Sequence, residues 1–135
     1  NRPDMELYGQ SFLLKLPESE LNISGDTDRL RSALENLCYN ALSFTPEEGT
    51  ITLSLREESG KAVISVEDTG SGIAPEDLPH VFDRGFTNRP DGSGEGLGLF
   101  LVRTTALEHG GTVEVRSQLG KGSVFTLCLP IVSRE

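Results

Sequence analysis

The chain has few of the residues that build cross-linked or membrane-spanning proteins. Its 135 residues include no tryptophan, one methionine, two cysteines and two histidines. Cys38 and Cys128 lie far apart and neither belongs to a CxxC pair, so the sequence indicates neither a disulfide framework nor a zinc site. We expect both cysteines to be small buried apolar residues in a reducing compartment. The longest strictly apolar run, residues 99–102, is far shorter than the ~18 residues that a membrane-spanning helix needs.

Basic residues are also scarce. The chain has 12 Lys and Arg against 21 Asp and Glu, a formal net charge of −9 at pH 7. This balance argues against a general nucleic-acid binder, which needs a basic face. An apolar share of 36% is too high for a wholly disordered chain. We therefore expect one domain over residues 1–135, with its core at residues 11–130. Because the first residue is Asn1 and not Met, we expect the chain to be a fragment of a longer protein.

Apolar periodicity predicts an alternation of strands and helices. Strands are expected at residues 11–16, 50–55, 62–67, 112–115 and 123–129, with a further short strand at 21–23. Helices are expected after Asp26, a candidate N-cap, and at residues 97–108, with one helical turn at 75–78. This order predicts an α/β (α+β) two-layer sandwich, in which about three helices cover one face of a mixed β-sheet.

Two asparagines flank the apolar stripe of the first predicted helix. Apolar residues recur there every three or four positions, at Leu30, Ala33, Leu34, Leu37, Cys38, Ala41 and Leu42. Asn36 and Asn40 are four residues apart and so share a helix face. Amide oxygens in this position can ligate a hydrated Mg²⁺. On this feature alone, the sequence favours two solvated amides on an exposed flank.

Two glycine-rich segments follow predicted elements. The sequence DTGSG at residues 68–72 directly follows a strand, where a carboxylate can accept a hydrogen bond from an exocyclic amine and glycines let a flat ring approach the backbone. On its own, this pattern is more typical of an ordinary acidic turn between a strand and a helix. The sequence GSGEGLGL at residues 92–99 opens a helix and frees several backbone N–H groups at its positive end, which suits phosphates. It lacks the Lys-Ser/Thr ending of a Walker A loop.

In combination and in order, these segments resemble the signature boxes of one family. NLCYNA at residues 36–41, DTGSGI at 68–73, VFDR at 81–84 and GSGEGLGL at 92–99 resemble the N, G1, F and G2 boxes of sensor histidine kinases. The closing segment, residues 109–130, is also similar to that family. The chain thus resembles the catalytic and ATP-binding domain of these kinases, within the GHKL superfamily. The resemblance covers residues 11–130 and implies the Bergerat ATP-binding fold.

The resemblance implies a role for individual residues. At the phosphate end, Asn40 ligates Mg²⁺ and Asn36 lines the same site; both count as catalytic, with Arg84. At the adenine end, Asp68 hydrogen-bonds the amino group, Phe44 packs against the base, and Ser123 assists Asp68. The other expected cofactor-binding residues are Gly70, Gly72, Ile73, Arg89, Gly94, Gly96, Leu97, Gly98 and Leu99.

Three positions depart from the family pattern. Ser43 stands where the N box usually carries Lys or Arg, so a contact to the γ-phosphate is either missing or supplied by Arg84 or Arg89. Gly85 stands where the F box usually has a second aromatic residue. The lid, residues 87–95, is short and has few basic residues. We therefore expect modest affinity for ATP.

The resemblance also implies what lies outside this chain. His80 and His109 have no context like that of a phosphate-accepting histidine, so the acceptor is expected on a separate dimerisation and histidine phosphotransfer domain. That domain and the receiver domain of a response regulator are the expected partners, with no direct contact to nucleic acid or membrane. The family implies a cytoplasmic domain within a protein anchored in the cell membrane.

Other functions remain open on the sequence. An anti-sigma-factor-type serine kinase has similar size and boxes, although the segment around Phe82 and the closing hairpin favour a histidine kinase. A degenerate module that binds nucleotide or a partner without transfer is also compatible with Ser43 and Gly85. Gyrase, chaperone or mismatch-repair ATPases fit less well, because they place a water-activating Glu at the position of Asn36 and Glu35 is one residue out of register.

Overall fold

The computed structural model describes residues 4–7, 9–17, 20–86 and 97–132. It contains a six-stranded sheet in the order β1-β2-β3-β4-β6-β5. The strands are β1 (Asp4–Leu7), β2 (Gln10–Lys15), β3 (Thr50–Glu58), β4 (Lys61–Asp68), β5 (Thr112–Gln118) and β6 (Gly122–Pro130). The β2–β3 pair is parallel and the other pairs are antiparallel, so the sheet is mixed, as expected.

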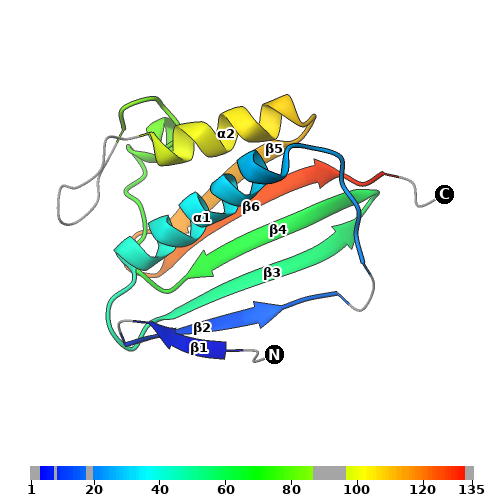
Figure 1. Cartoon of the computed structure of the whole chain (residues 1–135). Coiled ribbons are helices and arrows are strands. Elements are labelled where there is room, and N and C mark those ends of the chain that lie inside the picture. The colour runs from blue at the N-terminus through cyan, green and yellow to red at the C-terminus, as the bar shows by residue number, and fades with distance from the viewer. Residues whose placement is uncertain (1–3, 8, 18–19, 87–96, 133–135) are drawn as a thin grey trace.

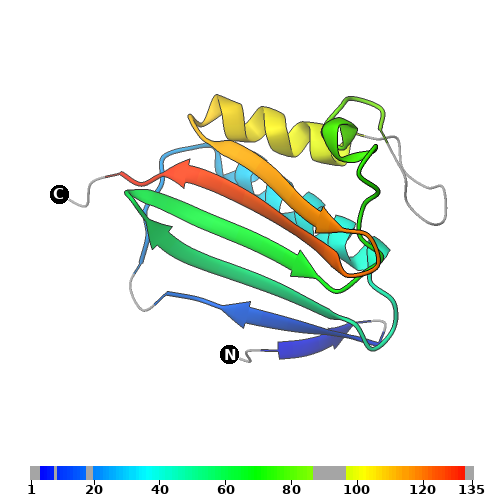
Figure 2. The same ribbon diagram turned by 180° about the vertical axis from the view of Figure 1, so that it is seen from behind.

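Two α-helices, α1 (Thr27–Phe44) and α2 (Gly98–Glu108), and a 3₁₀-helix, η1 (Leu78–His80), complete the described fold. Figures 1 and 2 show both α-helices on the same side of the sheet. The expected two-layer sandwich is therefore confirmed. No helix in the described part of the chain is both long and apolar enough to cross a bilayer.

The first helix begins where its cap predicts. The side chain of Asp26 accepts hydrogen bonds from the backbone N–H groups of Asp28 (3.0 Å) and Arg29 (3.1 Å), which satisfies two donors of the first turn. The apolar stripe then faces the sheet, and Leu37 is only 1% exposed. It packs in a core with Ile51, Val66, Val102, Phe125, Leu127 and Leu129.

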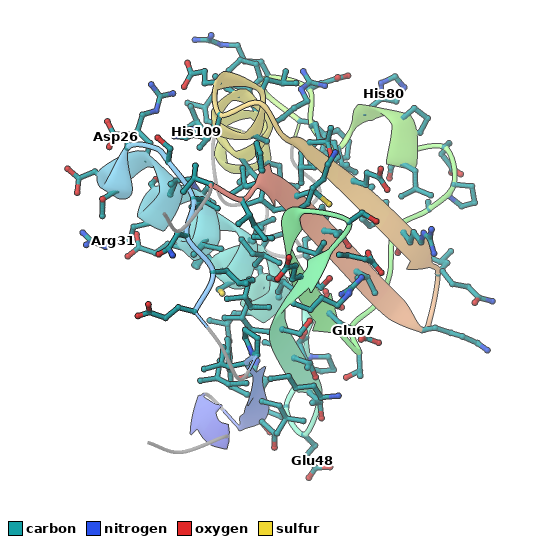
Figure 3. All side chains as sticks on the ribbon, turned by 90° about the vertical axis from the view of Figure 1, so that its right-hand side faces the viewer. Asp26, Arg31, Glu48, Glu67, His80 and His109 are labelled. Carbon is teal, nitrogen blue, oxygen red and sulfur yellow. The ribbon has the colours of Figure 1, made fainter. Side chains whose placement is uncertain are left out.

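The two helices run antiparallel, and His109 joins one pair of ends. The backbone N–H of Asp26 donates to Nε2 of His109 (3.1 Å), whose Nδ1 lies 2.8 Å from the carbonyl oxygen of Thr105. Figure 3 shows Asp26 and His109 close together at this end. Because Nε2 accepts, Nδ1 carries the proton. His109 is therefore a capping imidazole within the fold, as its sequence context suggests.

The structure differs from the local predictions at two places and extends a third. Residues 21–23 were predicted as a strand and form none: the N–H of Val132 donates to the carbonyl of Asn22 (2.8 Å), and a single bond of this kind makes no ladder. β1 was not anticipated, because it is a short edge strand created by its pairing with β2. The helical turn expected at 75–78 is present, since the N–H of Leu78 donates to the carbonyl of Ala74 (3.2 Å), and the 3₁₀-helix Leu78–His80 continues it.

Candidate functional site

The predicted site residues come from four elements that meet at one end of the sandwich. Asn36, Asn40 and Phe44 lie along the second half of α1, and Asp68 is the last residue of β4. Gly98 begins α2, and Ser123 lies in β6 opposite Asp68. A Cβ on Gly98 would lie 3.0 Å from Oδ1 of Asn36. The asparagine face of α1 is thus packed against the N-terminal end of α2.

Asp68 is a buried carboxylate. It is only 5% exposed, and its Oδ1 accepts a hydrogen bond from the backbone N–H of Gly70 (2.8 Å). Burial raises the pKa of Asp68; the N–H groups of Gly70 and Ser123 partly oppose this, and neighbouring Glu67 adds to it. A buried acceptor with capacity left beyond these bonds suits an exocyclic amine.

The asparagine amides are unusual for helix residues. Asn40 is 7% exposed and Asn36 is half-buried. Among the described residues, neither side chain has a hydrogen-bond partner. In the part of the chain that the structure describes, the one fully buried side-chain polar atom without a partner is Oε1 of Gln10, so the two asparagine amides keep access to solvent or to a ligand. These two amides therefore identify a polar binding surface.

The two glycines of the turn after β4, Gly70 and Gly72, lie close to the backbone of other segments. A Cβ on Gly70 would overlap the carbonyl oxygen of Phe44, and one on Gly72 would overlap the carbonyl oxygen of Gln118. Gly72 also has a φ of +76°, which favours glycine. The chain's own backbone fills these places, so the turn could not pack in this way with a larger residue at either position.

This turn is tied to the neighbouring segments. The backbone N–H of Ser71 donates to the carbonyl of Phe44 (3.3 Å), at the end of α1. Ile73 is buried, and its N–H donates to Oγ of Ser117 (2.7 Å) in β5. Asp68 is thereby held in a fixed place relative to Phe44 and to the β5–β6 hairpin.

Arg84 lies near the start of α2. Its guanidinium stacks over the ring of Phe100, 5.5 Å from the ring centroid, in the first turn of the helix. Leu97 immediately precedes the helix, and Leu99 packs against the core from its first turn. The predicted site residues Arg89, Gly94 and Gly96, and the whole of the lid at 87–95, lie outside the described residues.

Two residues of this region were given no role on the sequence alone. The ring of Phe100 contacts the guanidinium of Arg84. The hydroxyl of Ser117 makes hydrogen bonds with Ile73, Gly122 and Ser123, which lie close to Asp68. Ser117 follows Val113 and Val115 on the helix-facing side of β5, where alternation would favour an apolar residue. A serine at this position of the strand, paired with Ser123 in the β5–β6 ladder, is the sequence feature that could have pointed to Ser117.

The fold is a two-layer α/β sandwich with the buried carboxylate of Asp68 and the amides of Asn36 and Asn40 at one end. Residues 25–133 match the family described as histidine kinase-, DNA gyrase B- and HSP90-like ATPases. The chain belongs to this family.

The relatives found are sensor histidine kinases. The chain is 41% identical over 119 residues to the sensor histidine kinase ZraS of Salmonella typhi, covering 87% of this chain and 25% of that protein. It is 43% identical over 117 residues to the sensor-like histidine kinase SenX3 of Mycobacterium tuberculosis, covering 83% and 28%. The chain thus spans about a quarter of the length of these relatives. The resemblance inferred from the boxes is confirmed.

Solved structures of sensor histidine kinases have the same fold as this chain. The mycobacterial sensor histidine kinase MprB superposes with a TM-score of 0.80 at 29% identity, covering 91% of this chain and 83% of that one. Full-length ShkA in complex with AMPPNP gives 0.81 at 31% identity, covering 93% and 26%.

Proposed function

We propose that this chain binds Mg-ATP and donates its γ-phosphate to a histidine on a separate dimerisation domain of the same sensor kinase. The observation that carries the proposal is the nearly buried Asn40 amide, which has no partner among the described residues and lies one turn from the Asn36–Gly98 contact. ShkA, whose fold this chain shares, was solved with the ATP analogue AMPPNP. The relatives reported above favour a histidine over a serine as acceptor.

The residues present fit a magnesium ion that is held mainly by the nucleotide. The described residues contain no group of three or more His, Cys, Asp or Glu that could hold a metal by itself. Mg²⁺ in phosphate sites commonly takes one or two protein oxygens and otherwise phosphate oxygens and water, and the amide oxygen of Asn40 meets that need. When bound, the ion would neutralise charge on the phosphates.

The chain itself contributes positioning and charge. The backbone N–H groups at the start of α2 would face the phosphates, because the helix dipole favours negative charge at that end. Arg84, held by Phe100 at the same end, adds a positive charge. Asp68 orients the adenine through its amino group. In the transfer, the acceptor histidine forms a P–N bond while the bond from the γ-phosphorus to the bridging oxygen breaks and ADP leaves.

The wider setting follows from the same proposal. We infer that the phosphate passes from the dimerisation domain to the receiver domain of a response regulator. We also place this domain in the cytoplasm, within a kinase anchored in the cell membrane.

The chain alone is expected to bind Mg-ATP without labelling itself. Both ring nitrogens of His109 are engaged in hydrogen bonds, and Nδ1 of His80 lies 3.1 Å from Oδ2 of Asp83. Calorimetry should give saturable binding with a dissociation constant in the micromolar range or weaker, and incubation with γ-labelled ATP should give no acid-labile label. Absence of binding, or stable phosphohistidine on the chain, would contradict the proposal.

A further inference from the structure

The hydroxyl of Ser117 stands at the centre of a small hydrogen-bond cluster behind Asp68. The N–H of Ile73 donates to its Oγ (2.7 Å), the carbonyl oxygen of Gly122 lies 2.9 Å away, and Oγ of Ser123 lies 2.8 Å away. Ser117 is half-buried and Ser123 is 7% exposed. Because these four groups share few protons, each of them can act as a donor or as an acceptor in only one way.

The number of protons fixes the direction of every bond. A serine hydroxyl has one proton and two lone pairs, and a carbonyl oxygen can only accept. The proton of Ser117 therefore goes to Gly122, and the N–H of Ile73 occupies one of its lone pairs. The remaining lone pair of Ser117 accepts from Ser123. The proton of Ser123 is thus committed to Ser117, and Ser123 presents only lone pairs elsewhere.

Ser123 adjoins the carboxylate of the site. Asp68 and Ser123 are directly opposed in the β4–β6 ladder and face the same, helix-covered side of the sheet. Cβ atoms of such pairs are about 4.5–5.5 Å apart. The two side chains therefore form a patch that accepts hydrogen bonds, and the carboxylate Oδ1 already takes the N–H of Gly70.

We propose that Ser117 is a specificity-determining positioning residue: by taking the proton of Ser123, it keeps the patch beside Asp68 an acceptor and so selects nucleobases with an amino group over those with an oxo group. This inference rests on the proposed function and deepens it. Adenine offers N–H donors to such a patch, whereas the 6-oxo group of hypoxanthine or guanine would face acceptors without a proton between them. Two buried acceptors that face each other without a proton between them form no hydrogen bond, and such an arrangement is strongly disfavoured.

The test compares ATP with ITP, which carries an oxo group in place of the amino group. Calorimetry on the chain with Mg²⁺ should show that Ser117→Ala lowers the preference for ATP over ITP by about fivefold or more, the factor of one ordinary hydrogen bond. The reason is that the freed proton of Ser123 can then turn toward the 6-oxo group. Ser117→Thr keeps a hydroxyl in the same place and should keep the preference.

Ser123→Ala is the second variant, and it guards against a folding defect in Ser117→Ala. It removes the acceptor directly and should also lower the preference. In the Ser123→Ala background, Ser117→Ala should have no further effect on the ratio, because no hydroxyl remains to reorient. This coupling separates a role exerted through Ser123 from a merely structural one.

Several results would overturn the inference. Equal loss of affinity for both nucleotides in Ser117→Ala, an unchanged ratio in Ser123→Ala, or the same Ser117 effect in both backgrounds would each do so. These outcomes differ from failure of the proposed function, in which the unaltered chain would bind neither ATP nor ITP.

Discussion

Replacing Asp68 by Asn is expected to weaken ATP binding by roughly 10- to 100-fold, the loss typical of a hydrogen bond to a charged group. The amide can still accept the N–H of Gly70 through its oxygen, but it then turns an NH₂ group toward the adenine amino group, so donor meets donor. Calorimetry with Mg-ATP measures the change. The substitution also removes a buried charge, so we expect no loss of thermal stability at pH 7. Unchanged affinity would mean that Asp68 does not bind the base.

The pH dependence of the unaltered chain provides a check on the same residue. Burial raises the pKa of Asp68, so its ionised form is disfavoured in the fold and this penalty is relieved as pH falls through the raised pKa. A bound amino group favours the ionised form, so affinity for ATP should decline as the carboxylate is protonated, at a higher pH than for an ordinary Asp. This pH dependence should disappear in Asp68→Asn.

The second large effect is expected for Asn40→Asp. The new side chain has the same shape, so a purely steric role would tolerate it. It adds a negative charge to a 7%-exposed position beside the expected phosphates and removes the amide donors. Repulsion between such charges within a few ångströms amounts to about 1–4 kcal/mol, so phosphoryl transfer should fall by roughly 10- to 100-fold. Transfer rates at saturating Mg²⁺ measure it.

Glu35→Gln is the matched control on the same helix. Glu35 is exposed and lies one residue before Asn36. We expect normal transfer in this variant. If Glu35→Gln reduced turnover as much as Asn40→Asp, the site would instead use a water-activating Glu, as in an ATPase without histidine transfer.

Local signals in the sequence were sufficient where one strong interaction decides the structure. Asp26 starts α1 as its capping chemistry predicts, and the stripe around Leu37 faces the core. The four-residue spacing of Asn36 and Asn40 predicted that both amides lie on one helix face. The packing of Gly98 against Asn36, which the sequence does not show, distinguishes this face from a solvated flank.

Features that depend on pairing between distant residues could not be predicted from the sequence. β1 exists through its ladder with β2, while residues 21–23 have strand-like composition but no neighbouring strand. The sequence also could not show that the glycines at 70 and 72 are needed because the carbonyl groups of Phe44 and Gln118 approach them closely. The role of Ser117 depends on three partners from separate segments, and no sequence pattern gives the direction of their hydrogen bonds.

The most direct measurement supplies this chain with its own dimerisation domain, Mg²⁺ and γ-labelled ATP. The account predicts phosphohistidine on the dimerisation domain, none on this chain, and loss of label with Asn40→Asp but not with Glu35→Gln. An unlabelled dimerisation domain, although the chain binds Mg-ATP, would contradict it and identify a module that binds nucleotide without transferring phosphate.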